Sequence, residues 1–200
     1  MEQPVRQADY LARMEARHQE LGATLDAILP PQAVFTWEIG CGHGHFLTAF
    51  AQHHPTARCV GIDIAQERIE RAHRKQARAK LSNLHFVRAD ALGFLHALAA
   101  EATFAAIYIL FPDPWPKLRH NKHRLMQPEF LHAAALHAGE GTRLYFRTDH
   151  EAYFESARHT LSHHPAWRLV DEPWPFEHET VFQKRASSHR SLVACRSAIP

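Results

Sequence analysis

The sequence predicts an α/β fold with a mostly parallel, doubly wound sheet that carries helices on both faces. Segments typical of strands and helices alternate from residue 34 to residue 162, and this order favours right-handed crossovers between parallel strands. The segment 104–110 is the most apolar strand candidate, so we expect it at the buried centre of the sheet. Two later strand-like segments, 167–170 and 191–195, have no good helix between them. They predict an antiparallel C-terminal hairpin at one edge of the sheet.

The other elements follow from hydrophobic spacing and from the residues that end each run. Apolar residues at roughly helical spacing over 10–29 predict a helix that Pro30 and Pro31 end. Residues 1–30 are therefore expected to form an N-terminal helical extension. No repeat, low-complexity stretch or linker divides the chain, so residues 1–200 are expected to form one domain. The remaining patterns predict strands at 34–39, 59–62, 84–87 and 143–147, and helices at 46–53, 67–80, 91–100, 128–138 and 153–162.

The composition is ordinary for a globular protein, with 46% hydrophobic residues, 22% charged residues and a formal net charge of +2. This charge gives no global signal for a nucleic-acid partner, which must be argued from local charge. No apolar run approaches the roughly 20 residues that span a bilayer, and residues 1–10 lack the apolar core of a signal peptide. Three cysteines without framework spacing suit a reducing compartment. We therefore expect a cytoplasmic protein that does not contact membranes.

Histidine is unusually frequent, with 18 copies along the chain. No HExxH, CxxC or Cys/His cluster supplies the spacing that a metal site needs. We expect solvated surface histidines and no metal.

A glycine-rich turn, EIGCGHG (residues 38–44), lies between the first predicted strand and the next helix, where doubly wound folds bind nucleotides. Gly40, Gly42 and Gly44 allow a tight turn and a close approach of backbone to ligand. Their spacing differs from the dinucleotide fingerprint, and no Gly-Lys-Ser/Thr follows, which excludes a P-loop. The turn therefore predicts a ligand outside those two classes.

Three acidic residues stand at the ends of three successive predicted strands: Glu38, Asp63 and Asp90. The carboxyl ends of parallel strands share one edge, where Asp63 can accept both hydroxyls of a ribose and Asp90 can contact an adenine amino group. Glu38 would repel a pyrophosphate but suits a ligand that carries an ammonium and a sulfonium. This arrangement resembles the S-adenosylmethionine site of the Rossmann-like methyltransferases.

A proline-rich segment follows the central strand and emerges at the same edge. Its three prolines restrict the backbone and hold Asp113 and Trp115 with little conformational freedom. A rigid acid and an aromatic ring beside cations suit a nucleobase whose phosphate backbone is bound nearby. Four such cations follow within eight residues: Lys117, Arg119, Lys122 and Arg124.

The full segment FPDPWPKLRHNKHRLMQPEF (residues 111–130) resembles the signature of the bacterial tRNA (guanine-N7)-methyltransferases. The resemblance covers roughly residues 34–155 and extends through EIGCGHGHFL, GIDIAQERIERA, NLHFVRADAL and YFRTDHEAYFE. It implies a Rossmann-like class I methyltransferase fold, S-adenosylmethionine as cofactor, and transfer of its methyl group to guanine N7 in tRNA. It further assigns Lys117 and Asp149 to substrate contact and four carboxylates to the cofactor site and its catalytic edge: Glu38, Asp63, Asp90 and Asp113.

Residues 180–183, TVFQ, fall where that family has Thr-Lys-Phe-Glu. The resemblance makes Thr180 and Gln183 further substrate-binding positions. Val181 replaces the family's lysine and Gln183 replaces its glutamate. These changes bear on recognition of the base or of the tRNA, and leave the methyltransferase core unchanged.

Guanine N7 carries a lone pair and no proton at neutral pH, so its methylation needs no general base. We expect catalysis from alignment of N7 with the methyl group and the sulfur, and from a carboxylate that stabilises the positive charge developing on guanine. Asp113 is the candidate for this catalytic role and for accepting hydrogen bonds from guanine N1 and N2. Asp149 either shares this task or caps the helix that follows it.

Alternatives remain open at the level of single residues. Trp115 either stacks on a base or packs within its loop. Either Arg119, Lys122 and Arg124 meet phosphates, with help from His120 and His123 when these are protonated, or the run is a solvated basic face.

Two other functions also remain open. A small-molecule methyl acceptor would need a closed apolar pocket in place of a basic rim. A family offshoot that binds RNA or a partner without catalysis is kept open by the altered TVFQ segment. Monomer and homodimer are both compatible with the sequence.

Overall fold

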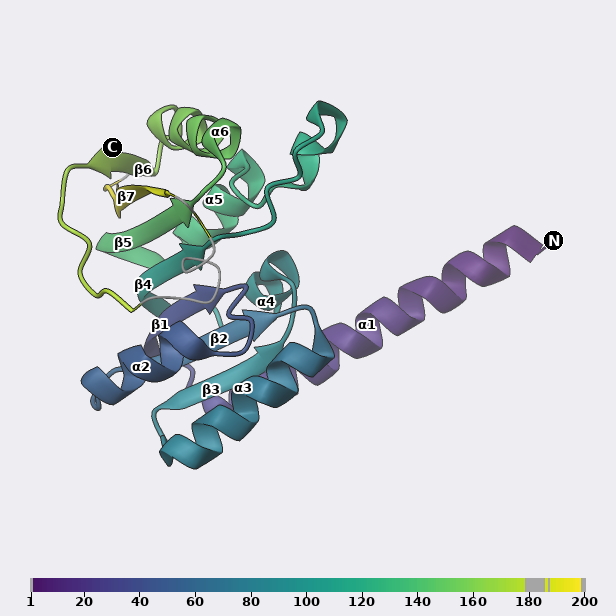
Figure 1. The fold of residues 1–200 in the computed structure, drawn as a ribbon. Helices are drawn as coiled ribbons and strands as arrows, with labels where there is room; N and C mark the ends of the chain where they lie inside the picture. Colours follow the sequence, from purple (N-terminus) through teal and green to yellow (C-terminus); the bar gives the residue numbers. More distant parts are fainter. Residues whose placement is uncertain (1, 179–185, 187, 199–200) are drawn as a thin grey trace.

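The computed structural model describes residues 2–178, 186 and 188–198 and shows a seven-stranded sheet between two layers of helices (Figure 1). The strand order is β3-β2-β1-β4-β5-β7-β6. All neighbours from β3 to β5 are parallel, whereas β7 is antiparallel to both β5 and β6. The predicted fold, a mostly parallel sheet with an antiparallel C-terminal edge, is confirmed. The strands are β1 (Val34–Ile39), β2 (Arg58–Asp63), β3 (Leu84–Arg88), β4 (Thr103–Leu110), β5 (Ala138–Thr148), β6 (Trp167–Val170) and β7 (Arg190–Arg196).

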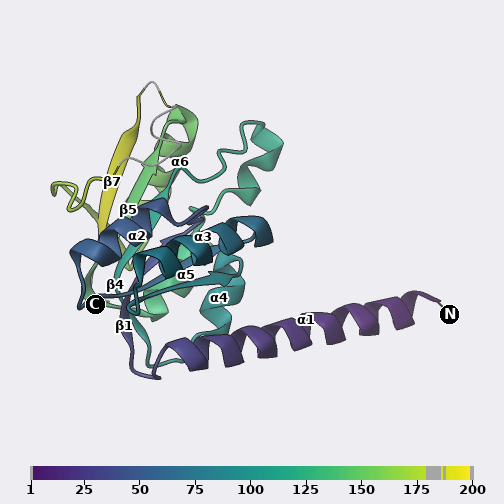
Figure 2. The ribbon, with the colours of Figure 1, turned by 60° about the horizontal axis from the view of Figure 1, so that its bottom comes forward.

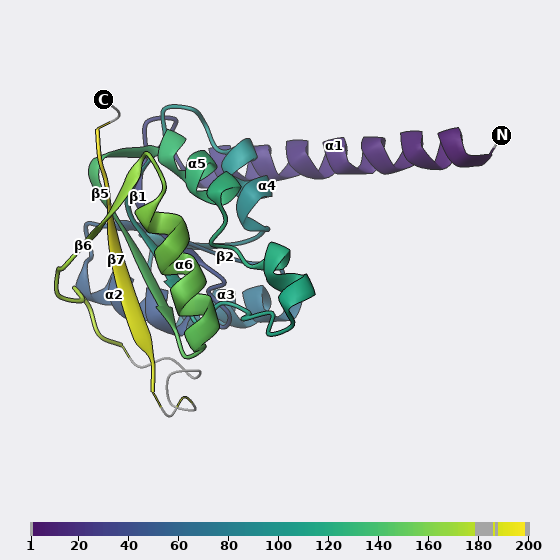
Figure 3. The same cartoon turned by 90° about the horizontal axis from the view of Figure 1, so that it is seen from above.

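The helices divide between the two faces of the sheet. One face carries α1, α4, α5 and α6, and the other carries α2 and α3 (Figures 1 and 3). A short 3₁₀ helix, η1, follows β4 outside these layers. The helices are α1 (Glu2–Ile28), α2 (His45–His53), α3 (Gln66–Ala79), α4 (Ala91–Ala97), η1 (Leu118–His123), α5 (Pro128–Leu136) and α6 (Glu151–Ser162).

Aromatic rings form the centre of the larger core, on the α4 and α5 face. The Trp37 ring lies between Phe94 and Phe104, with ring centroids 4.8 and 5.0 Å away and nearly parallel planes. Such stacked rings bury large apolar areas and fix β1 against β4 and α4. The central position predicted for 104–110 therefore follows from the packing on this face.

Helices α2 and α3 cover only part of the opposite face. An irregular segment next to α2 covers the rest of it, over β4 and β5. We call residues 171–178 the C-terminal segment. Its Trp174 ring packs edge-on against Tyr145, with centroids 5.4 Å apart, and its Phe176 ring packs against Phe46 and Phe50, 5.7 and 5.4 Å away. Aromatic side chains rather than a helix thus shield β4 and β5 from water.

Helix α1 extends away from the sheet, and its C-terminal end packs on α4 (Figures 1 and 2). Leu25 and Leu29 are buried there, whereas Met14 is 46% exposed. Within the described residues, no helix is both long and apolar enough to cross a bilayer.

Three element bounds differ by three residues or more from the ranges that the sequence patterns predict. Helix α1 begins at Glu2 instead of residue 10, and α4 ends at Ala97 instead of residue 100, because Leu98 turns to extended backbone and enters the core. Strand β5 begins at Ala138 instead of residue 143. Pairing of Ala138 with Phe104 on β4 extends this strand through two glycines, a residue type with weak strand propensity.

Candidate active site

The glycine turn joins β1 to α2 at the carboxyl edge of the sheet. Gly40, Gly42 and Gly44 all have positive φ, at 71°, 54° and 68°. A Cβ atom on Gly44 would lie 2.4 Å from Cζ of Phe86 on β3, so packing requires a glycine there. A Cβ atom on Gly40 or Gly42 would meet nothing within 4 Å. The first two glycines therefore border open space, where a ligand can approach the backbone.

Glu38 is a buried acid beside this turn. The residue is 3% exposed, and burial raises the pKa of its carboxyl to about 8, although a backbone hydrogen bond at Leu47 opposes the shift. Its Oε2 atom has no hydrogen-bond partner in the described part of the chain. A buried carboxylate with an unused acceptor is unfavourable unless a donor or a cation reaches it. Glu38 is therefore suited to a positively charged ligand.

Asp63 connects the turn to the next strand. Its Oδ2 accepts a hydrogen bond from the Gly42 backbone N–H at 3.1 Å, and its Oδ1 accepts one from the Ala65 N–H at 2.8 Å. Arg68 on α3 approaches the same carboxylate at 3.4 Å. Asp63 thus holds the glycine turn in position, in addition to the ligand contact expected from the sequence.

Asp90 lies at the exposed end of β3 and caps α4. Its Oδ1 accepts a hydrogen bond from the Gly93 backbone N–H at 2.8 Å. Because β3, β2 and β1 are neighbours, the structure brings Glu38, Asp63 and Asp90 to one edge of the sheet.

The proline-rich turn after β4, residues 111–117, emerges at the same edge, and we call it the proline loop. Phe111 and Trp115 have positive φ values of 51° and 44°, which side chains other than glycine rarely adopt. Such strained conformations persist only where the surroundings enforce them, and they often accompany functional sites. Asp113 is exposed on this loop.

Arg124 helps to hold the proline loop in this conformation. Its Nε donates to the Pro114 carbonyl at 2.8 Å and its Nη1 donates to the Ala152 carbonyl at 3.2 Å. The guanidinium lies 5.0 Å from the centre of the Tyr153 ring, and the residue is only 4% exposed. The sequence placed Arg124 among the phosphate-binding cations. In the structure its charge is buried against α6, so we assign it instead to the support of the proline loop.

The other three cations, Lys117, Arg119 and Lys122, are exposed on the proline loop and η1. Trp115 is 38% exposed and packs against the rings of His120 and His123, with centroids 5.8 and 5.1 Å away. The three rings thus form an aromatic cluster bordered by cations. The backbone that carries them, the proline loop and η1, projects from the sheet edge (Figure 3).

Asp149 is exposed at the end of β5, next to α6. The cap of α6 is His150, whose Nδ1 accepts a hydrogen bond from the Tyr153 backbone N–H at 3.2 Å. The alternative that Asp149 caps this helix is therefore not what the structure shows. Thr180 and Gln183 lie outside the described residues.

Arg147, near the end of β5, is a residue that the sequence reasoning missed. It donates to both carboxylate oxygens of Glu177 at 2.9 and 2.8 Å and to Ser191 Oγ at 2.9 Å. Its guanidinium also lies 3.9 Å from the centre of the Trp174 ring. An arginine directly after the apolar run Leu144-Tyr-Phe was the available signal, since a buried cation needs a partner. Arg147 fixes the C-terminal segment to the sheet.

Comparisons with known proteins agree with this geometry. A family model described as "Putative methyltransferase" matches residues 32–192. The tRNA (guanine-N(7)-)-methyltransferase of Treponema pallidum is 33% identical over 171 residues, which cover 84% of this chain and 68% of that protein. The protein of the same name from Halalkalibacterium halodurans is 35% identical over 131 residues, or 66% of this chain, and the match spans only 59% of that relative.

Solved structures give the fold independently. A methyltransferase from Pyrococcus furiosus has a TM-score of 0.60 at 17% identity, over 87% of this chain and 80% of that one. An antibiotic-related methyltransferase has a TM-score of 0.57 at 22% identity, over 87% and 92% of the two chains. At these identities the likeness establishes a shared Rossmann-like architecture.

Proposed function

Because this chain belongs to the family of tRNA (guanine-N7)-methyltransferases, we propose that it transfers a methyl group from S-adenosylmethionine to N7 of a guanine in tRNA. The observation that carries this proposal is the buried Glu38 carboxylate beside the open side of the glycine turn. In a methyltransferase, a cationic methyl donor is the ligand that such a carboxylate suits.

The residues at the carboxyl edge fit S-adenosylmethionine by their chemistry. Glu38 offers an unpartnered acceptor to the ammonium group, and Gly40 and Gly42 leave space for close backbone contact. Asp63 and Asp90 would bind the ribose hydroxyls and the adenine amino group. When bound, the cofactor supplies an electrophilic methyl group on a sulfonium. Asp63 would then exchange its contact with Gly42 for the ribose, or share it.

Asp113 is the proposed catalytic residue on the acceptor side. Its carboxylate would accept hydrogen bonds from guanine N1 and N2 and so orient N7 toward the methyl group. The same negative charge would stabilise the cationic guanine as it forms. N7 has no proton to lose, so no residue of the chain has to act as a base.

Exposed cations around Asp113 would bind the RNA backbone. Lys117, Arg119 and Lys122 are exposed beside the Trp115 ring, and Asp149 borders the same edge from the end of β5. Binding of phosphates by Lys and Arg makes affinity fall steeply with salt. In our proposal the Trp115 cluster packs against an unstacked base while these cations hold the neighbouring phosphates.

The test is methyl transfer from labelled S-adenosylmethionine to bulk tRNA that lacks 7-methylguanosine, followed by nucleoside analysis. We expect labelled 7-methylguanosine from the unaltered protein. Asp113→Ala is expected to lower the rate by about 10²- to 10³-fold, the size typical for loss of one preorganised electrostatic contact.

Cofactor binding, measured with S-adenosylhomocysteine, separates the two ways in which the proposal can fail. Binding without any methylated product would show that the acceptor is not this tRNA base. A different labelled nucleoside would move the target to another atom. No binding at all would remove the assignment of Glu38 and the glycine turn.

A further inference from the structure

Helix α3 carries a row of cations along one line, and two of them lie next to α2. Arg68, Arg71, Lys75 and Arg78 are three, four and three residues apart, so they recur once per helical turn along one line, and we call them the cationic row. The neighbouring line, Ile69, Ala72, Gln76 and Ala79, faces the sheet or is partly buried.

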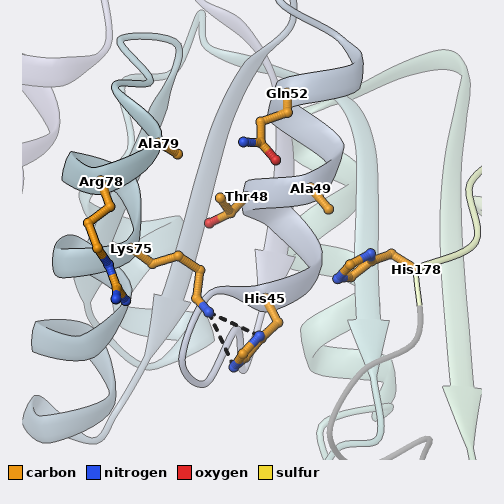
Figure 4. Close-up of a pocket in the computed structure, with 8 residues that line it drawn as sticks. All are labelled: His45, Thr48, Ala49, Gln52, Lys75, Arg78, Ala79 and His178. Carbon is orange, nitrogen blue, oxygen red and sulfur yellow. Dashed lines mark hydrogen bonds between the residues drawn. The ribbon is translucent and has the colours of Figure 1, made fainter.

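Two members of the cationic row, Lys75 and Arg78, line a groove between α2 and α3 that has a volume of about 360 Å³. Figure 4 shows Lys75 crossing toward His45 at the start of α2, with its Nζ 3.0 Å from Nδ1 of that histidine, and Arg78 one turn further along α3. Side chains able to donate hydrogen bonds dominate the lining, which consists of His45, Thr48, Ala49, Gln52, Lys75, Arg78, Ala79 and His178. We call this feature the α2/α3 groove.

Thr48 provides a second and independent sign of a ligand. The residue is 5% exposed, its hydroxyl points toward α3 (Figure 4), and the Oγ1 atom has no hydrogen-bond partner in the part of the chain that the structure describes. A buried hydroxyl without a partner is unfavourable, because it has given up its hydrogen bonds with water and gained none in return. An oxygen atom held between the two helices would satisfy it.

Positive charge is in excess around the groove. The pKa of Lys75 is lowered by burial and by Arg78, and the pKa of His43 is lowered by burial and then by Arg71, Arg68 and Lys75. Arg68 pairs with Asp63, but among the described residues Arg71, Lys75 and Arg78 form no ion pair with a carboxylate. A bound anion would relieve this repulsion.

We propose that the α2/α3 groove and its cationic row bind the phosphodiester backbone of the RNA acceptor, at a surface separate from the proline loop. A line of cations spaced by one helical turn, about 5 Å, suits the regularly repeated charges of a nucleic-acid strand better than a single small anion. The row begins at Arg68, which contacts Asp63 at the proposed cofactor site, and leads away from it along α3. An RNA whose guanine reaches Asp113 would thus be held on both sides of the glycine turn. This inference rests on the proposed function, because it takes RNA as the acceptor.

The experiment compares salt-dependent tRNA binding by three forms of the full chain. The row variant carries Arg71→Gln, Lys75→Gln and Arg78→Gln, and leaves Arg68 to its contact with Asp63. The control variant carries Arg17→Gln, Arg158→Gln and Arg168→Gln, and so removes the same charge from exposed positions on α1, α6 and β6. Glutamine keeps a helix propensity close to that of lysine and arginine. Thermal unfolding and S-adenosylhomocysteine binding establish that each variant retains its fold and cofactor site.

We expect the row variant to reduce the slope of log affinity against log salt by about 2, since each lost phosphate contact removes about 0.7–0.9. Affinity for tRNA at low salt should fall at least about tenfold, while the control changes both quantities much less. Equal changes of slope and affinity in the two variants would show that only the net charge of the protein matters, and would overturn the inference. An unchanged slope in a row variant that still folds would overturn it while leaving the proposed function intact. Failure of the unaltered protein to bind tRNA would instead refute the acceptor itself, and the inference with it.

Discussion

The proposed site has two parts: a cofactor edge, formed by the glycine turn and its neighbouring acids, and an acceptor edge, formed by the proline loop and η1. The two parts are built in opposite ways. At the glycine turn the proposed ligand groups Glu38 and Asp63 are themselves buried and held by the backbone around them. At the proline loop Asp113 and Lys117 are exposed, and the buried residue is Arg124, which holds the loop from behind.

This difference follows from the size of the two proposed ligands. A small cofactor can be enclosed, so its contacts can be part of the core. A tRNA cannot be enclosed, so the residues that contact it must be exposed to solvent. Buried residues behind them must then hold them in position. Substitutions at the cofactor edge should therefore alter folding and binding together, whereas substitutions at the acceptor edge should separate them.

The largest change in stability is expected at Gly44, the residue of the cofactor edge that packs against the core. Gly44→Ala would press a Cβ atom against Phe86 and strain a residue with positive φ, so it should lower the free energy of unfolding by about 3–4 kcal/mol. Gly40→Ala adds only the backbone strain, about 1–2 kcal/mol. Urea unfolding measures both. Equal losses would mean that contact with Phe86 does not distinguish these two glycines.

On the acceptor edge the corresponding change is Arg124→Met. It removes the donors to the Pro114 and Ala152 carbonyls and should lower the free energy of unfolding by about 2–3 kcal/mol. Arg119→Met, on the same stretch of chain but exposed, is the matched control and should change it by less than about 0.5 kcal/mol. If unfolding does not distinguish the two variants, Arg124 does not support the loop.

The raised pKa of Glu38 predicts that both stability and cofactor affinity depend on pH through the cofactor edge. Its folded-state pKa of about 8 lies above the usual 4.5, so the folded protein binds a proton that the unfolded chain releases between these values. Stability without ligand should therefore fall as pH rises from 4.5 to 8. Because the ionised form binds the ammonium group, affinity for S-adenosylhomocysteine should rise about tenfold per pH unit below pH 8.

Glu38→Gln is the control for both pH trends. It should flatten the dependence of stability on pH and remove the rise in affinity, which calorimetry at pH 6, 7 and 8 would measure. A variant that keeps the wild-type trends would place the titrating group elsewhere.

The smallest expected effect separates two roles of Asp90. Asp90→Ala loses the cap on α4 and should lower the free energy of unfolding by about 1 kcal/mol. Asp90→Asn keeps a capping oxygen, so its stability should stay near that of the unaltered protein. If Asp90 also binds the cofactor, both variants should weaken S-adenosylhomocysteine binding severalfold, and normal binding by Asp90→Asn would limit this residue to capping.

The sequence predicted the cofactor edge better than the acceptor edge, for a physical reason. Strand ends can be located from short apolar runs, and parallel strands bring their ends together, which is why Glu38, Asp63 and Asp90 were grouped correctly at one edge. Arg124 and Arg147 could not be placed in the same way. Their partners, such as the Ala152 carbonyl and Glu177, are distant in sequence and form no local pattern.

The roles of the site residues themselves stay predictions, including those of Thr180 and Gln183 outside the described residues. The family resemblance that began with the proline-rich segment is confirmed. The α2/α3 groove had only one trace in the sequence, the basic character of 67–80. The number of basic residues in this segment does not show that Thr48, on another helix, lines the same groove.

The position of β7 between β5 and β6 also sets an order of assembly during synthesis. Strands β1 to β4 can pair as they leave the ribosome, but β6 has no neighbour in the sheet until β7 arrives. Until then the long edge of β5 exposes unpaired backbone groups, the usual template for aggregation. Chains that end before residue 190 are accordingly expected to self-associate through β5. Size-exclusion chromatography of such a truncation, beside the intact chain, would detect this hazard of interrupted translation.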